Sequence, residues 1–206
     1  QKSAFAGIFY PEDSIELNET IKTFIDEGGP LPQEVFTGKV RAIIVPHAGY
    51  EYSGEVAGYG YAAVKGGEYK KVIVIGPSHQ LWFRDLAFCS CEQWQTPIGV
   101  LKIEPPDPLS ERMQPATEAF HQEHSLEVQL PFIKKSLKNC SCTLLVTGDI
   151  GDYQLVSEDL LKLITPETLL VISSDLSHYH DYQQAQRIDM VAISEILNLE
   201  GIDQDQ

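Results

Sequence analysis

Three short apolar runs, each followed within a few residues by a histidine, constrain the fold of this chain more than any other feature. The runs span residues 42–45, 71–76 and 168–173, and the histidines are His47, His79 and His178. Short β-branched runs bounded by turn residues are typical of buried strands in a parallel sheet. Ligands of open parallel sheets bind at the carboxyl ends of the strands, where the following loops gather. We therefore expect the three histidines to converge on one edge of one sheet.

The three histidines suit both metal binding and proton transfer. A single loop histidine is more often a hydrogen-bonded surface group, but three in the same position after three strands favour a shared site. Neutral imidazole is a common metal ligand and also transfers protons near neutral pH. We therefore predict that two histidines bind a metal ion and the third acts as an acid or base. Asp175, three residues before His178, either orients an imidazole or caps the next helix.

The remaining chain predicts an α/β fold. Strands alternate with helical segments, which favours a layered domain with a mostly parallel or mixed central sheet flanked by helices. A chain of 206 residues with 43% hydrophobic content can bury one core, so we expect a single domain over residues 1–206. The apolar spacing of residues 118–138 predicts one long helix, kinked at Pro131.

The charge balance excludes two classes of partner. Thirty acidic residues against fifteen basic ones give a formal net charge of −15. Such a charge repels phosphate backbones and anionic lipid, so we expect neither nucleic acid nor membrane as a partner. The sequence has no apolar run long enough to span a bilayer and no signal peptide, so we expect a cytoplasmic location.

The four cysteines form two Cys-x-Cys pairs, Cys89 with Cys91 and Cys140 with Cys142. If residues 86–91 continue as a strand, both thiols of the first pair lie on one face of it. A four-thiol zinc site usually has two to four residues between paired cysteines. We therefore favour free thiols over a structural zinc site.

Several motifs together resemble those of the Memo family, named for the mediator of ErbB2-driven cell motility. They occur in one order along essentially the whole chain. They are Ala-Gly-Ile-Phe-Tyr-Pro (6–11), Pro-His-Ala-Gly-Tyr-Glu-Tyr-Ser-Gly (46–54), Gly-Pro-Ser-His (76–79), Thr-Pro-Ile-Gly (96–99), Glu-His-Ser-Leu-Glu-Val-Gln-Leu-Pro (123–131) and Ser-Ser-Asp-Leu-Ser-His-Tyr (173–179).

The resemblance implies a fold like that of the class III extradiol dioxygenases, which hold one non-haem iron. Carried over by motif, His47 and His79 are metal ligands, and His178, with Asp175 beside it, is the acid/base residue. The implied cofactor is iron(II), with copper or zinc as alternatives. The third metal-site residue of the family is a cysteine in a Cys-Gly motif near the C-terminus. No such motif precedes Gln206, so we expect the C-terminal part of the family domain to be absent.

A set of further residues is expected to line a substrate pocket beside the metal: Tyr52, Trp82, Arg84, Glu123 and His124. The spacing of His121 and His124 also permits a rival metal site on one helix. Their His-Gln-Glu-His sequence matches neither metalloprotease motif, which disfavours that class.

Three functions follow from the resemblance. The first is an O₂-dependent redox enzyme, or a vestigial dioxygenase that retains the metal site. The second is a non-catalytic module that binds phosphotyrosine-type peptides. The third is a component of a radical-linked modification system, like microbial relatives of the family. The expected ligand is accordingly a small molecule or a peptide, and the sequence specifies no oligomeric state.

Overall fold

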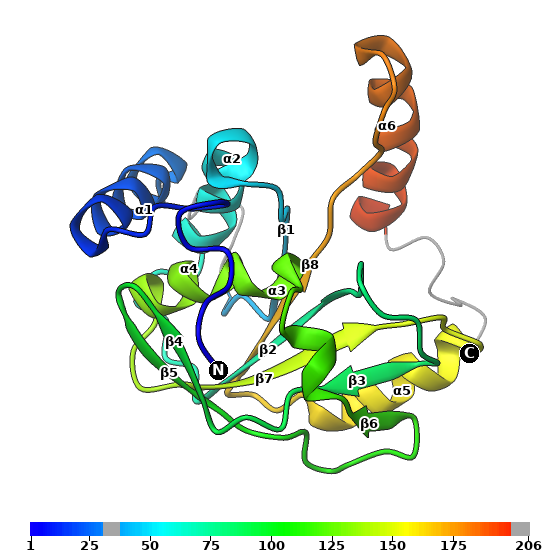
Figure 1. Cartoon of the computed structure of the whole chain (residues 1–206). Helices are drawn as coiled ribbons and strands as arrows, with labels where there is room; N and C mark the ends of the chain where they lie inside the picture. Colours follow the sequence, from blue (N-terminus) through cyan, green and yellow to red (C-terminus); the bar gives the residue numbers. More distant parts are fainter. Residues whose placement is uncertain (31–37, 199–206) are drawn as a thin grey trace. The chain divides into compact units, whose positions relative to one another are not determined.

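The computed structural model describes residues 1–30 and 38–198. The chain forms two compact units, Gln1–Ser174 and Asp175–Gln206. The single domain expected over residues 1–206 stays a prediction. The first unit carries the sheet (Figure 1). In the second unit, helix α6 spans Tyr182–Asn198.

One eight-stranded mixed sheet forms the centre of the first unit. Its main path runs in the order β1-β8-β2-β7-β3-β6, and β4 and β5 attach through a β5–β7 pairing. The strands are β1 (Ala42–Val45), β2 (Lys71–Pro77), β3 (Leu86–Phe88), β4 (Gln93–Thr96), β5 (Gly99–Ile103), β6 (Met113–Pro115), β7 (Ser141–Thr147) and β8 (Thr168–Ser173).

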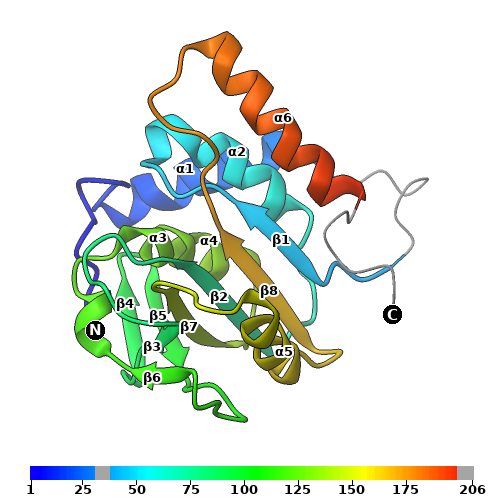
Figure 2. The same cartoon turned by 90° about the vertical axis from the view of Figure 1, so that its right-hand side faces the viewer.

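The four strands β1, β8, β2 and β7 pair in parallel and lie side by side (Figure 2). The β3–β7 and β4–β5 pairs are antiparallel. This arrangement confirms the predicted α/β fold with a mostly parallel, mixed sheet. The expected strands at 42–45, 71–76 and 168–173 are present, and β1, β8 and β2 are neighbours in the sheet.

Both faces of the central strands β2 and β7 are buried, which explains why these strands are continuously apolar. In β2, Val72 and Val74 belong to one hydrophobic cluster, whereas Ile73 and Ile75 belong to a second. Side chains alternate between the faces of a strand, so the two clusters lie on opposite faces of the sheet.

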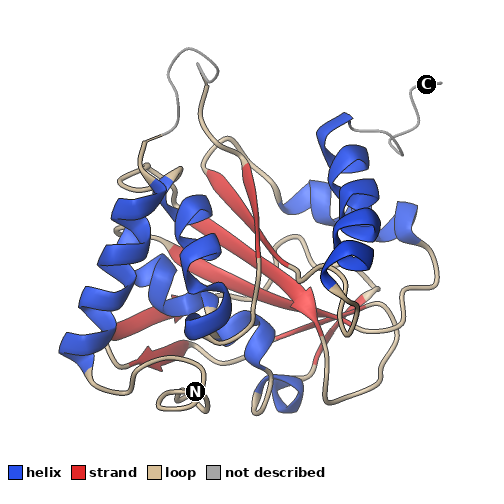
Figure 3. Cartoon of the chain, turned by 90° about the horizontal axis from the view of Figure 1, so that it is seen from above, coloured by secondary structure: helices blue, strands red, loops and turns tan. Residues whose placement is uncertain are grey.

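Helices cover the two faces. The first cluster includes buried side chains of α1 (Ser14–Gly28), α2 (Tyr50–Ala62), α3 (His124–Glu127) and α4 (Gln129–Ser136). The second includes side chains of α5 (Tyr153–Leu163). Figure 3 shows the helices of the first layer lying across the strands. The first unit is therefore a three-layer α/β/α structure.

The single long helix predicted over residues 118–138 is wrong. The segment instead forms a 3₁₀ turn, η1 (Thr117–Phe120), followed by α3 and α4. Glu123 has an extended backbone and caps α3 by accepting the N–H of Ser125. Pro131 lies in the first turn of α4. Backbone N–H groups of a first turn have no acceptor within the helix, so the N–H that proline lacks costs no helical hydrogen bond there. The break places Glu123 and His124 at the start of a helix instead of inside one.

Among residues 1–30 and 38–198, no helix is both long enough and apolar enough to cross a membrane.

Candidate metal centre

Three histidines of the first unit gather at the carboxyl ends of β1 and β2. His47 follows β1 and His79 follows β2, as the sequence predicts. His124 comes from α3, which is held against the end of β2 because the Ser125 hydroxyl donates to the carbonyl of Pro77 at 2.8 Å. The sheet edge and one short helix therefore build the cluster together.

The three imidazoles are close enough to share one ion. Each offers one ligand nitrogen, and these nitrogens all lie within 4.8 Å of one another. The ring centroids of His79 and His124 are 4.5 Å apart, and that of His47 is 5.4 Å from the first and 5.7 Å from the second. His47 is only 3% exposed, whereas His79 and His124 are partly open to solvent. The cluster is therefore buried at His47 and more accessible to solvent at His79 and His124.

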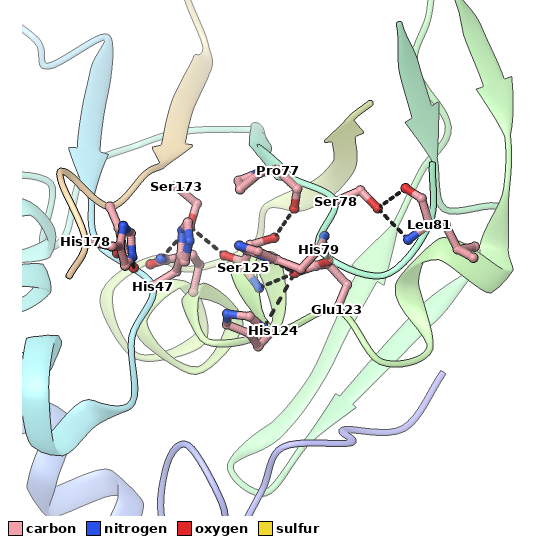
Figure 4. Close-up of polar contacts among 12 residues, drawn as sticks. His47, Pro77, Ser78, His79, Leu81, Glu123, His124, Ser125, Ser173 and His178 are labelled. Atoms are coloured by element: carbon pink, nitrogen blue, oxygen red, sulfur yellow. Dashed lines mark hydrogen bonds and ion pairs between the residues drawn. The ribbon is translucent and has the colours of Figure 1, made fainter. Parts of the chain in front are cut away.

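The hydroxyl of Ser173 determines the tautomer of His47 (Figure 4). Ser173 donates its one hydroxyl proton to the carbonyl of Ser125. The same oxygen accepts the side-chain amide of Gln129 at 2.9 Å and lies 3.1 Å from Nδ1 of His47. Because the serine proton is already committed, Nδ1 of His47 must be the donor, and Nε2 carries the lone pair.

The buried carboxylate of Glu123 is the hydrogen-bond partner of Nδ1 in His79. Oε1 of Glu123 lies 2.8 Å from Nδ1 of His79, and Oε2 accepts the backbone N–H of His79 at 2.6 Å. Burial acts to raise the pKa of Glu123, but hydrogen bonds from His79 and Ser125 outweigh it and leave this pKa below its usual value. The ionised carboxylate accepts the Nδ1 proton, so in the neutral imidazole the lone pair of His79 is on Nε2.

His124 is held by aromatic rings and by the same carboxylate. Its ring stacks on that of His79 and contacts the rings of Phe5 and Phe9, at centroid distances of 5.7 and 4.7 Å. Its Nδ1 lies 3.7 Å from Oε1 of Glu123. Two phenylalanines near the start of the chain therefore form one wall of the cluster.

Glu127, which is fully buried on α3, anchors those phenylalanines. Its carboxylate accepts the backbone N–H groups of Ala4 and Phe5 and the hydroxyl of Tyr10, at 2.7 to 3.0 Å. Burial raises the pKa of Glu127 above its usual value. Charged hydrogen bonds of this kind fix the early segment of the chain against α3.

The donor set suits a transition metal. Imidazole nitrogen binds iron, copper, zinc and nickel, whereas magnesium and calcium prefer oxygen ligands. Both oxygens of Glu123 are engaged in the hydrogen bonds described above, so this carboxylate is placed to orient the imidazole of His79. The cluster can therefore hold a metal ion through three nitrogens.

The predicted pocket residues separate into three groups. Glu123 and His124 belong to the cluster, and Trp82 lines a cavity of about 410 Å³ that also includes His79, Leu81 and Gly148. Trp82 is 81% exposed. Tyr52 and Arg84 are also exposed but do not line this cavity.

His178 and Asp175 belong to the second unit. Nε2 of His178 lies 3.4 Å from Oδ2 of Asp175, so this carboxylate is close enough to orient the imidazole. The assignment of His178 to proton transfer stays a prediction.

The other candidate metal sites do not form within the described part of the chain. His121 is exposed and lies outside the cluster. The cysteines are free thiols, and among residues 1–30 and 38–198 they form no group of three or more that could hold an ion.

The sequence predicts His124 as a pocket residue, or as a ligand of a rival site with His121, and predicts no role for Ser173 or Gln129. The Glu-His-Ser motif at 123–125 was the available signal for His124. Gln129 and Ser173 lie within the motifs at 123–131 and 173–179, but their contact with each other depends on which strands and helices meet.

The chain is similar to proteins of one family. Residues 1–204 match the family described as Memo-like protein. A MEMO1 family protein of Aquifex aeolicus is 35% identical over 216 residues, which cover 98% of this chain and 77% of the relative. One of Thermotoga maritima is 36% identical over 227 residues, covering 98% and 78%. The protein memo-1 homolog of Caenorhabditis elegans is 31% identical over 192 residues, covering 87% and 53%.

Proposed function

This chain belongs to the Memo family, and from that premise we propose that it is a metal-binding protein whose ion is held by His47, His79 and His124. The observation that carries the proposal is the convergence of three imidazole nitrogens within 4.8 Å of one another. The fixed tautomers of His47 and His79 support it, because each ring directs its proton to a protein acceptor and keeps Nε2 as the ligand atom.

The proposed ion is iron(II). A redox-active ion at three imidazoles supplies a Lewis acid that can bind O₂ and an oxygen-bearing substrate. Copper and zinc are the alternatives that the same donors accept. The resemblance assigns a third metal-site role to a cysteine of a Cys-Gly motif, and no Cys-Gly pair occurs in these 206 residues. We propose His124 as the third ligand because its nitrogen lies within 4.8 Å of those of His47 and His79.

The surrounding residues would position the ligands and the substrate. Glu123 and Ser173 contact Nδ1 of His79 and His47, and so would orient these rings and leave Nε2 of each as the ligand atom. The cavity beside His79 offers space for a substrate, with Trp82 as an apolar wall. His178 is the proposed acid/base residue of an O₂-dependent oxidation.

Metal content tests the proposal directly. The protein is purified anaerobically and its iron, copper and zinc are measured by mass spectrometry, for the wild type and for His47→Ala, His79→Ala and His124→Ala. His121→Ala is the matched control, because this exposed histidine lies three residues before His124 and outside the cluster. Circular dichroism confirms that each variant folds.

We expect near-stoichiometric metal in the wild type and in His121→Ala, and its loss in each cluster variant. His178→Ala should keep the metal and lose any O₂-dependent turnover. Retention of wild-type metal content by all three cluster variants would reject the site. Retention by His124→Ala alone would remove His124 from the ligand set.

A further inference from the structure

Gln129 is the first residue of α4, and its side chain is fully buried. Its amide nitrogen donates one proton to the backbone carbonyl of Pro46 at 2.8 Å and the other to the hydroxyl oxygen of Ser173 at 2.9 Å. Its side-chain oxygen accepts the hydroxyl of Tyr61 at 3.1 Å. Both polar atoms of this buried amide therefore have partners, and the partners come from three different segments of the chain.

The partners determine which way the amide points. A carbonyl oxygen can only accept, so the NH₂ group must face Pro46 and the side-chain oxygen must face Tyr61. The second N–H then points at Ser173, whose own proton is donated to a backbone carbonyl. A hydroxyl oxygen accepts two hydrogen bonds at most. Gln129 takes one of these positions, and the other faces Nδ1 of His47 at 3.1 Å.

Gln129 therefore reaches His47 by two routes. The first is the backbone, because Pro46 directly precedes His47 in the chain. The second is the ring, because the Ser173 hydroxyl that Gln129 contacts is also the partner of Nδ1 (Figure 4). One side chain thus holds both the main chain and the imidazole of a proposed ligand.

A simpler interpretation is that Gln129 only joins α4 to the ends of β1 and β8. Those strand ends are already joined by the sheet, because Val45 pairs with Ser173 and the N–H of Ser174 donates to the carbonyl of Val45 at 2.9 Å. The pairing of β1 stops at Val45, two residues before His47. The contacts of Gln129 therefore hold the part of the chain that the sheet does not.

The other two proposed ligands depend on the same short segment. Glu123 accepts the Nδ1–H of His79, and His124 is itself a proposed ligand. The contacts of Gln129 add His47 to this set. One segment, which starts at Glu123 and ends at Gln129, would in this way position all three imidazoles.

We propose that Gln129 is a positioning residue of the metal centre, which orients His47 through Pro46 and Ser173. This inference rests on the proposed function, because it takes His47 as a ligand of the ion. The two donated hydrogen bonds of the amide keep Nδ1 of His47 directed at Ser173 and leave Nε2 as the ligand atom. Gln129 acts through His47 and is not a ligand itself.

Three variants separate the donated hydrogen bonds from the accepted one. Gln129→Met keeps an unbranched side chain and removes every hydrogen bond of the amide. Gln129→Glu keeps an acceptor for Tyr61, but a carboxyl group has at most one proton and cannot donate to both Pro46 and Ser173. Tyr61→Phe removes the accepted bond and leaves both donated bonds in place. Circular dichroism confirms that each variant folds.

NMR of the ¹⁵N-labelled, metal-free protein measures the tautomer of each imidazole. It is recorded at about pH 8, where an unperturbed imidazole is neutral, and the signals are assigned with His47→Ala and His79→Ala. We expect the Nδ1–H form for both rings in the wild type. In Gln129→Met and Gln129→Glu, His47 should shift toward a mixture with the Nε2–H form, whereas His79, held by Glu123, should not change. His79 is thus an internal control for general loosening of the structure.

Iron(II) binding gives the second measurement. Anaerobic competition titration against a chelator should show an affinity at least about tenfold lower in both Gln129 variants, as is usual when a partner that orients a ligand is lost. Tyr61→Phe should keep the wild-type tautomer of His47 and an affinity close to that of the wild type.

The proposal fails on any of three results. The first is a wild-type tautomer of His47 with wild-type affinity in both folded Gln129 variants. The second is an equal change at His47 and His79, which would mean a general structural role. The third is a loss in Tyr61→Phe as large as that in Gln129→Met. A wild type that binds no iron(II) would instead reject the proposed function, while the tautomers of the metal-free protein would still decide whether Gln129 orients His47.

Discussion

The carboxylate of Glu123 accepts both the backbone N–H and the ring Nδ1–H of His79, at 2.6 and 2.8 Å. It also accepts the N–H of Ser125 and so caps α3, which carries His124. One buried side chain therefore orients one imidazole and begins the helix that supplies another. Removing it should disturb two of the three proposed ligands.

Glu123→Gln is the substitution that tests this role. The amide keeps one oxygen but turns an NH₂ group toward donors that need an acceptor. We expect metal affinity to fall by about 10- to 100-fold, the usual effect of losing a partner that orients a ligand. Competition titration against a chelator measures it. Glu118→Gln is the matched control, because Glu118 is exposed on the preceding turn, and an equal affinity in both variants would contradict the role of Glu123.

Ser173→Ala should weaken metal binding by another route. It removes the hydroxyl that accepts from Gln129 and donates to Ser125, and it removes the Nδ1 partner of His47. Buried polar groups left without partners cost about 1–3 kcal/mol, so urea unfolding of the metal-free protein should show a loss of that size. Ser173→Thr keeps a hydroxyl and should retain more affinity. Unchanged affinity in Ser173→Ala would show that this hydroxyl does not control the His47 tautomer.

The sequence predicts half of this centre because strand ends can be recognised locally. The runs before His47 and His79 have the length and composition of buried parallel strands, and β1 and β2 lie on either side of β8. Parallel strands present their carboxyl ends at one edge of the sheet. The convergence of the two histidines can therefore be predicted without information on tertiary contacts.

The other half depends on contacts between distant segments. Ser173 meets His47 because the register of β8 against β1 sets Val45 beside Ser173. His124 reaches the cluster because the chain breaks before α3 instead of continuing as the helix that apolar spacing predicts. The buried carboxylate of Glu123 accepts three hydrogen bonds, and these override the local helix propensity. The spacing of apolar residues in the sequence does not predict these hydrogen bonds.

Glu127→Gln should release the early segment of the chain from α3. The buried carboxylate accepts two backbone N–H groups and the Tyr10 hydroxyl, and an amide replaces one acceptor by a donor. We expect a loss of about 1–3 kcal/mol in unfolding free energy. Hydrogen exchange should quicken at Ala4 and Phe5 while the amides of α5 keep their protection. Unchanged exchange at both residues would mean that Glu127 does not hold this segment.

Gly58→Ala should separate α1 from α2. A Cβ atom at this position would lie 2.4 Å from the backbone carbonyl oxygen of Phe24, which cannot rotate away. Alanine gains about 1 kcal/mol of helix propensity over glycine, but overpacking of this kind costs about 1–3 kcal/mol. We therefore expect net destabilisation in thermal unfolding. Gly38→Ala, where no atom lies within 4 Å, is the control, and equal stability of the two variants would contradict the close packing.

Asp159 on α5 should make stability depend on pH in the acid range. This buried carboxylate accepts hydrogen bonds from Ser110, from Lys162 at 2.9 Å and from Arg112 at 2.8 Å, and these bonds lower its pKa. An acid whose folded pKa is depressed stabilises the fold above its unfolded pKa, about 3.9, and loses that contribution as the pH falls below it. Asp159→Asn should therefore lower the free energy of unfolding by about 1–3 kcal/mol at neutral pH.

Urea unfolding at a series of pH values should show this loss of stability unchanged down to about pH 4 and shrinking below it. Exposed Glu158→Gln is the control, and a deficit that stays constant into strong acid would mean that the charge of Asp159 does not stabilise the fold.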